Sequence, residues 1–183
     1  VVTGGAPLDL ILRKVNDISG YFYRTIELLL DRPLRTRGAP ERYIQEQCKP
    51  WLFQAPAGSY QFSVRVQKPM QAQLFGDDLP KIQHITDKFI EIIDAAARED
   101  FEELERVVPN EDYRKTFLRM TRNLAPTGKT YEKIVITPSK RGRIDKVTLS
   151  PESRAGVNAL IKSTQKEKQQ IDTPTQQVRF SGV

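Results

Sequence analysis

The sequence predicts an α+β fold, in which an antiparallel sheet of about four to five strands, built from two hairpins, carries amphipathic helices packed mainly on one face. Two observations support this prediction. Several segments place apolar residues three or four positions apart, which is the spacing of an amphipathic helix. Two other segments alternate apolar and polar residues on either side of a turn-forming sequence, as hairpins do. These segments follow one another at irregular lengths, unlike the regular strand–helix alternation of a parallel sheet.

The first predicted helix spans residues 8–30 and is the longest well-patterned element. Its apolar stripe consists of Leu8, Ile11, Val15, Ile18, Phe22, Ile26 and Leu29. These steps of three and four residues trace one helical face. Residues 41–48, between prolines, have room for two helical turns at most.

Further helices are expected over residues 80–97, 99–108 and 110–124. Asn110 is the expected N-cap of the third, because its side chain can accept a hydrogen bond from the first helical turn. A last helix begins at Ser150-Pro151, a capping residue followed by a first-turn proline. It is expected to give way to a polar linker from Lys162 onward.

Two hairpins are predicted. In the first, residues 51–54 pair with residues 59–67, where the alternation of Tyr60, Phe62, Val64 and Val66 with polar residues indicates one dry face. The aromatic side chains of this hairpin, including Trp51, are therefore expected in the core rather than stacked on nucleic-acid bases. The second hairpin joins residues 131–137 to residues 143–149. At the end of the chain, residues 178–183 predict an edge strand or the start of a further β-rich module.

The chain is expected to divide at the turn that follows the third of these helices. Residues 1–125 would form a helix-rich α+β core with the first hairpin. Residues 126–183 would supply the second hairpin, the last helix and the terminal strand, packed on the same core. A length of 183 residues suffices for one substantial core.

The net charge of +6 conceals three segments of different sign. Residues 1–76 hold 10 Lys and Arg against 6 Asp and Glu, a net of +4. Residues 77–112 hold 4 against 12, a net of −8, and residues 113–183 hold 15 against 5, a net of +10. Such asymmetry means either that one molecule has an acidic and a basic face, or that the two segments neutralise each other on docking.

The tripeptide Gly128-Lys129-Thr130 resembles the end of a phosphate-binding loop, but its surroundings exclude that function. The loop motif requires a glycine at the position of Asn123 and a strand–loop–helix order. Here a predicted helix comes before the tripeptide and a predicted strand after it. The sequence therefore predicts a plain helix-to-strand connection.

No catalytic residue is predicted. His84 and Cys48 have no partner that the sequence identifies, so we expect an ordinary surface or rim histidine and a half-buried cysteine. Glu99, Glu102 and Glu103 are close in sequence, yet metal sites of enzymes gather carboxylates from separate elements. A solvated helix face is the expected explanation of this acidic run.

Exposed cations are expected around the second hairpin and on the last helix. They are Lys140, Arg141, Arg143, Lys146, Lys162, Lys166 and Lys168. Flexible cations of this kind gain affinity for a polyanion through counterion release. No helix-turn-helix signature and no aromatic-rich RNA-binding signature accompanies them, so a nucleic-acid interface competes with an ordinary solvated basic surface.

The leading hypothesis is a non-enzymatic intracellular binding domain, one module of a larger protein or complex, with a protein as its partner. The separation of acidic and basic segments suits electrostatically guided docking. A nucleic-acid-binding protein is one alternative, and an enzyme whose site is assembled from scattered residues is another. One cysteine, one histidine and the absence of any apolar run near 20 residues predict a cytoplasmic protein without disulfide, metal, cofactor or membrane contact.

Overall fold

A computed structural model describes residues 8–54, 62–66, 79–138 and 143–171, with the side chains of 52–54, 62 and 165–171 left out of the description. The described residues form a mixed helix-and-strand fold of six helices and two small antiparallel sheets, which confirms the α+β class. No helix within these ranges is both long enough and apolar enough to cross a membrane.

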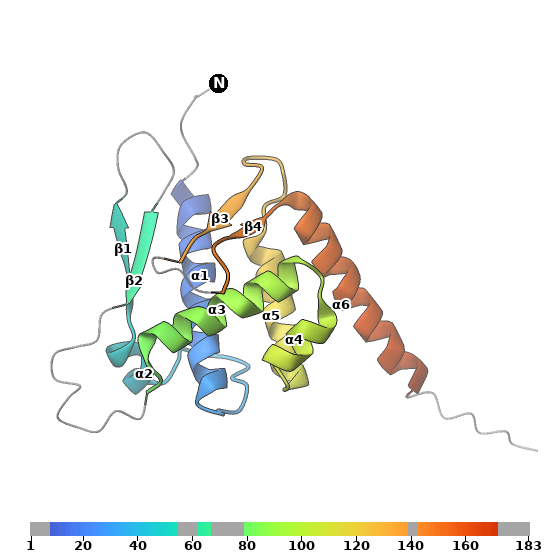
Figure 1. Cartoon of the computed structure of the whole chain (residues 1–183), viewed down its shortest axis with the longest axis horizontal. Coiled ribbons are helices and arrows are strands. Elements are labelled where there is room, and N and C mark those ends of the chain that lie inside the picture. The colour runs from blue at the N-terminus through green and yellow to red at the C-terminus, as the bar shows by residue number, and fades with distance from the viewer. Residues whose placement is uncertain (1–7, 55–61, 67–78, 139–142, 172–183) are drawn as a thin grey trace, which may run out of the picture.

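The helices follow the predicted periodicity closely (Figure 1). They are α1 (Leu8–Leu29), α2 (Arg42–Gln47), α3 (Ile82–Ala97), α4 (Phe101–Val107), α5 (Glu111–Leu124) and α6 (Pro151–Ile171). Two predicted caps are confirmed. The side chain of Asn110 accepts a 3.1 Å hydrogen bond from the amide of Tyr113, and the hydroxyl of Ser150 accepts one of 3.3 Å from the amide of Ser153.

The prediction that the last helix ends near Lys162 is wrong, because α6 continues to Ile171. Residues 162–171 contain neither glycine nor proline, and most of them are Lys, Gln or Glu. These residues are good helix formers, so nothing in the segment ends the helix. The polar composition that suggested a linker therefore belongs to a polar helix.

The strands form two separate hairpins. β1 (Pro50–Gln54) pairs with β2 (Phe62–Val66), with Trp51 opposite Arg65. β3 (Ile134–Ile136) pairs with β4 (Val147–Leu149), and these two sheets are not joined in the described residues. Both predicted hairpins are confirmed, whereas a single sheet of four to five strands is not formed by the described parts of the chain. The predicted terminal strand lies outside the described residues.

The core lies among α1, α3 and α5 rather than beneath a sheet. Tyr21 of α1 is fully buried, and its ring meets Phe89 of α3 edge-on at 5.3 Å and Phe117 of α5 at 5.0 Å. Its hydroxyl hydrogen-bonds that of Thr121 at 3.1 Å. Further buried members of the same cluster come from β4 and α6: Val147, Leu149 and Val157.

The first hairpin contributes less to the core than the alternation predicted. Val66 packs against the core, but Val64 is 39% exposed and Trp51 48% exposed. The expectation that Trp51 and Val64 are buried is therefore wrong. Among the described residues of this hairpin, Val66 packs against the helical core, whereas Val64 and Trp51 are not part of the core cluster.

Candidate functional site

The Gly128 segment is a turn, as predicted from its neighbours. It follows α5 and precedes β3, so the order is helix, loop, strand. Gly128 has a φ of +78°, which glycine adopts at no steric cost, and Lys129 is exposed. This geometry lacks the helix N-terminus on which a phosphate loop depends.

The residues considered for catalysis lie in ordinary positions. His84 is exposed in the first turns of α3, whereas Cys48 is fully buried after α2, more deeply than the half-burial expected. In the acidic run, Glu99 and Glu102 are exposed and Glu103 binds Arg106, whose hydrogen bonds lower the pKa of the Glu103 carboxyl. Within the described ranges, no three His, Cys, Asp or Glu side chains are grouped as metal ligands.

The predicted basic residues are only partly placed. Lys140 and Arg141 lie outside the described residues, and so do the side chains of Lys166 and Lys168 on α6. Lys146 and Lys162 are exposed. Arg143 is also exposed, and its guanidinium lies 3.9 Å from the carboxylate of Glu103. The described members of the set are thus not assembled into one site, and the nucleic-acid interface stays a prediction.

The acidic and basic segments meet at α4 and α5. Arg114, on α5, forms a 3.0 Å ion pair with Glu105 of α4 and donates a hydrogen bond of 2.9 Å to the carbonyl of Val108. Together with the Arg143–Glu103 contact, this pair shows that some of the opposite charges neutralise each other within the fold. The cations that remain unpaired among the described residues are the ones available to an external anion.

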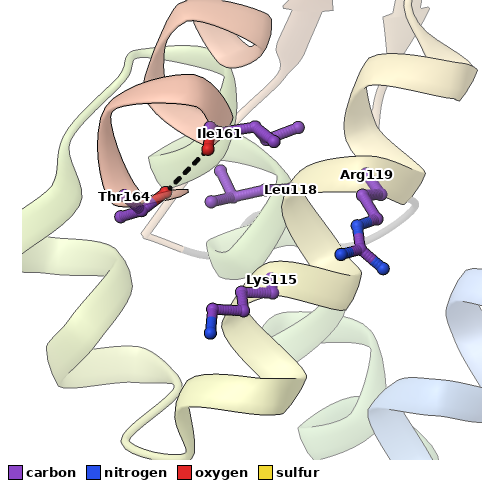
Figure 2. Close-up of a pocket in the computed structure, with 5 residues that line it drawn as sticks. All are labelled: Lys115, Leu118, Arg119, Ile161 and Thr164. Atoms are coloured by element: carbon purple, nitrogen blue, oxygen red, sulfur yellow. Dashed lines mark hydrogen bonds between the residues drawn. The ribbon is translucent and has the colours of Figure 1, made fainter. Parts of the chain in front are cut away.

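A groove between α5 and α6 combines unpaired charge with apolar surface (Figure 2). Its volume is about 100 Å³, and its lining residues are Lys115, Leu118, Arg119, Ile161 and Thr164. Figure 2 shows Leu118 and Ile161 close together between the two helices, with Lys115 one turn earlier on α5 and the guanidinium of Arg119 directed away from them along the outer side of α5. We call Leu118 and Ile161 the floor of the groove and Lys115 and Arg119 its rim.

Helical spacing explains how these residues come together. Leu118 follows Phe117 on the buried side of α5 and is 1% exposed, while Lys115 and Arg119 stand one turn apart at the border of that side. Ile161 and Thr164 are three residues apart on α6 and so share a face. The hydroxyl of Thr164 bonds the carbonyls of its own helix, at 2.8 Å from Leu160 and 3.1 Å from Ile161.

The two rim cations differ in their electrostatic state. Lys115 forms a 2.8 Å ion pair with Glu111, one turn earlier on the same helix. Arg119 is exposed and has neither an ion pair nor a hydrogen bond among the described residues. Since Thr164 directs its hydrogen bond to the α6 backbone, Arg119 is the group with the most capacity to bind an incoming anion.

The C-terminal end of α5 is fixed by cations from two other helices. Lys14 of α1 donates a hydrogen bond to the carbonyl of Asn123. Arg154 of α6 donates to the carbonyl of Arg122 and, at 3.2 Å, to that of Ala125. Positive charge is favourable at this end of a helix. Burial lowers the pKa of Lys14 below its ordinary value. These contacts set α5 against α6, and therefore the two sides of the groove.

Sequence reasoning missed this groove. Lys115, Leu118 and Arg119 lie within the helix predicted over residues 110–124, and Ile161 lies within the helix predicted from Ser150-Pro151. The available signal was a pair of cations at i and i+4 on either side of a core-facing leucine. That signal is common on surface helices, and only the packing of α5 on α6 turns it into a hollow.

Comparison of the chain with models of protein families, with curated proteins and with solved structures gives no significant match.

Proposed function

We propose that this chain is a non-enzymatic protein-binding domain that docks an acidic segment of a protein partner on the face formed by α5 and α6. The observation that carries the proposal is the groove, where an apolar floor lies beside a cationic rim whose Arg119 has no partner in the described structure. Complementary charge would attract the partner and fix its orientation.

The size of the groove favours a side chain over a small molecule. Small-molecule and cofactor sites typically occupy roughly 300–1,000 Å³. The volume of about 100 Å³ between α5 and α6 is well below that range. The groove is also smaller than the cavity of about 150 Å³ that accepts benzene, so it can take at most one protein side chain and not a nucleotide or a cofactor.

The composition of the groove favours a protein over a nucleic acid. Phosphate groups gain nothing from the apolar floor of Leu118 and Ile161, whereas an apolar side chain does. Cations already paired with carboxylates, such as Arg114 with Glu105, also contribute less to counterion release. Nucleic-acid binding remains the second candidate because Lys162 is exposed on α6, the helix that also carries Lys166 and Lys168 in its sequence.

A displayed library of short random peptides tests the proposal. The wild-type chain should enrich peptides rich in Asp and Glu. The double variant Arg119→Glu with Lys162→Glu should lose those peptides, because it reverses the charge of the α5–α6 face. The matched control, Arg13→Glu with Lys133→Glu, makes the same charge change at exposed cations elsewhere and should retain them. An absence of enrichment, or enrichment that both double variants share with the wild type, would count against the function.

A further inference from the structure

The floor of the groove offers a place for an apolar group of the partner. Leu118 is almost fully buried and closes the bottom of the groove, whereas Ile161 is half-buried against the core and keeps some accessible apolar surface. Thr164 directs its hydroxyl to the carbonyls of Leu160 and Ile161. A side chain that enters the groove therefore meets mainly carbon atoms and already satisfied polar groups, and its burial is favourable without any hydrogen bond.

The rim offers a second, different contact within one helical turn of the first. Arg119 presents a planar guanidinium that can hold a carboxylate through two parallel hydrogen bonds. Lys115 lies four residues earlier and is held at 2.8 Å from Glu111 in a partly exposed ion pair of small net stability. A second carboxylate of the partner can compete with Glu111 for Lys115, so the rim can hold negative charge along about 6 Å of α5.

We infer that the groove recognises a short peptide segment in which one large apolar side chain is flanked by carboxylates. The apolar side chain enters the hollow between Leu118 and Ile161, and an adjacent carboxylate binds Arg119. This inference rests on the protein-binding function proposed above and specifies its partner. In this inference, Arg119 determines specificity for acidic segments. The floor determines the preference for acidic peptides that also carry a large apolar side chain.

Two synthetic peptides test this recognition by fluorescence anisotropy at low salt. One consists of Glu and Ala with a single central Leu, and the other has Ser in place of that Leu. The wild-type chain should bind the Leu peptide about tenfold more tightly, the effect of burying most of one leucine side chain.

Arg119→Gln should weaken the binding of both peptides about tenfold, because each loses a charge-assisted contact. Arg13→Gln, the same substitution at an exposed position of α1, is the matched control and should change neither affinity.

Ile161→Ala supplies the decisive comparison, because it removes part of the floor and leaves the rim intact. It should reduce affinity for the Leu peptide and leave that for the Ser peptide unchanged, with circular dichroism confirming the fold. Equal affinity of the wild type for both peptides would overturn the inference, although an acidic docking face would still stand. Absence of binding by both peptides would also overturn it, and the random library would then decide the broader function separately. Tighter, Arg119-dependent binding of an oligonucleotide of the same charge would overturn both.

Discussion

The phenol of Tyr113, on α5, donates a hydrogen bond of 3.0 Å to the backbone carbonyl of Arg32, which lies 81 positions earlier in the segment just after α1. The chain leaves α1 there through Asp31, whose φ of +52° is left-handed. The amide of Arg32 donates to the carbonyl of Glu27 at 2.9 Å. Tyr113 thus fixes the start of α5 to the last turn of α1.

Replacement of Tyr113 by Phe should destabilise the fold by about 1 kcal/mol, the typical net value of one hydrogen bond. The ring itself remains, so its contact with Phe117 at 6.0 Å is kept. The free energy of unfolding from urea titration measures the effect. An unchanged free energy would mean that water replaces Tyr113 at the Arg32 carbonyl without loss.

The same residue predicts a loss of stability in alkaline solution. Burial, and then the negative charge of Glu27, raise the pKa of Tyr113 from 10.0 to about 12. Because the folded state holds this proton more tightly than the unfolded state, its contribution is complete below pH 10 and is lost as the pH rises to about 12. Urea titrations across this range should show a steeper decline for the wild type than for Tyr113→Phe, and parallel declines would contradict the prediction.

Glu27→Gln should be among the most damaging substitutions of a charged residue. The Glu27 side chain is only 5% exposed and binds two guanidinium groups, those of Arg24 at 2.8 Å and Arg35 at 2.9 Å. Removing one partner from a buried ionic cluster leaves uncompensated charge, and we expect a loss of about 3 kcal/mol. Glu46→Gln, which breaks an exposed pair with Arg42, should cost less than about 1 kcal/mol. Similar losses in the two variants would argue against a structural role for the Glu27 cluster.

Glu99→Gly should stabilise the protein by about 1 kcal/mol, because L-residues are disfavoured in left-handed conformations. Glu99 follows the end of α3 with a φ of +59°, and the amide of Asp100 donates to the carbonyl of Ala95 at 3.0 Å, as in a glycine-ended helix. Glu102→Gly, one residue into α4, is the control and should cost about 1 kcal/mol. Melting temperatures that move in the same direction for both variants would contradict this explanation.

Salt dependence tests the nucleic-acid alternative. If Lys140, Arg141 and Arg143 contact phosphates, their replacement by Ala should weaken binding to duplex DNA. The dependence of log affinity on log salt should also flatten by roughly 0.9 for each lost contact. An unchanged slope, or no binding by the wild type at low salt, would remove this alternative.

Most of the helical architecture could be predicted, because it depends on local pattern. The stripe from Leu8 to Leu29 and the caps at Asn110 and Ser150 each depend on residues that are only a few positions apart in the sequence. The missed length of α6 was also local information, since residues 162–171 lack a helix-breaking residue. Polar composition is typical of an exposed helix as well as of a linker, and it does not by itself end a helix.

The remaining differences depend on tertiary contacts that no local pattern contains. Glu27 is a charged residue, a type usually exposed on a helix, yet it is buried because two arginines pair with it, one of them from beyond the end of α1. Trp51 is expected in the core from strand alternation and is half-exposed, because the burial of a strand face depends on which element packs over it. The groove depends on how α5 packs against α6, which is why its residues were not singled out.

Because α5 is anchored at both ends, its position bears on the rate at which a partner would associate. Tyr113 ties its first turn to Arg32, and Lys14 and Arg154 hold the carbonyls of its last turn. If the groove binds a protein segment as proposed, it is already formed in the free chain, and no conformational step needs to precede binding. Association should then approach the rate of charge-steered encounter, on the order of 10⁷–10⁸ M⁻¹s⁻¹ at low ionic strength. Added salt should slow arrival of the partner, while changes to the apolar floor should shorten its residence time.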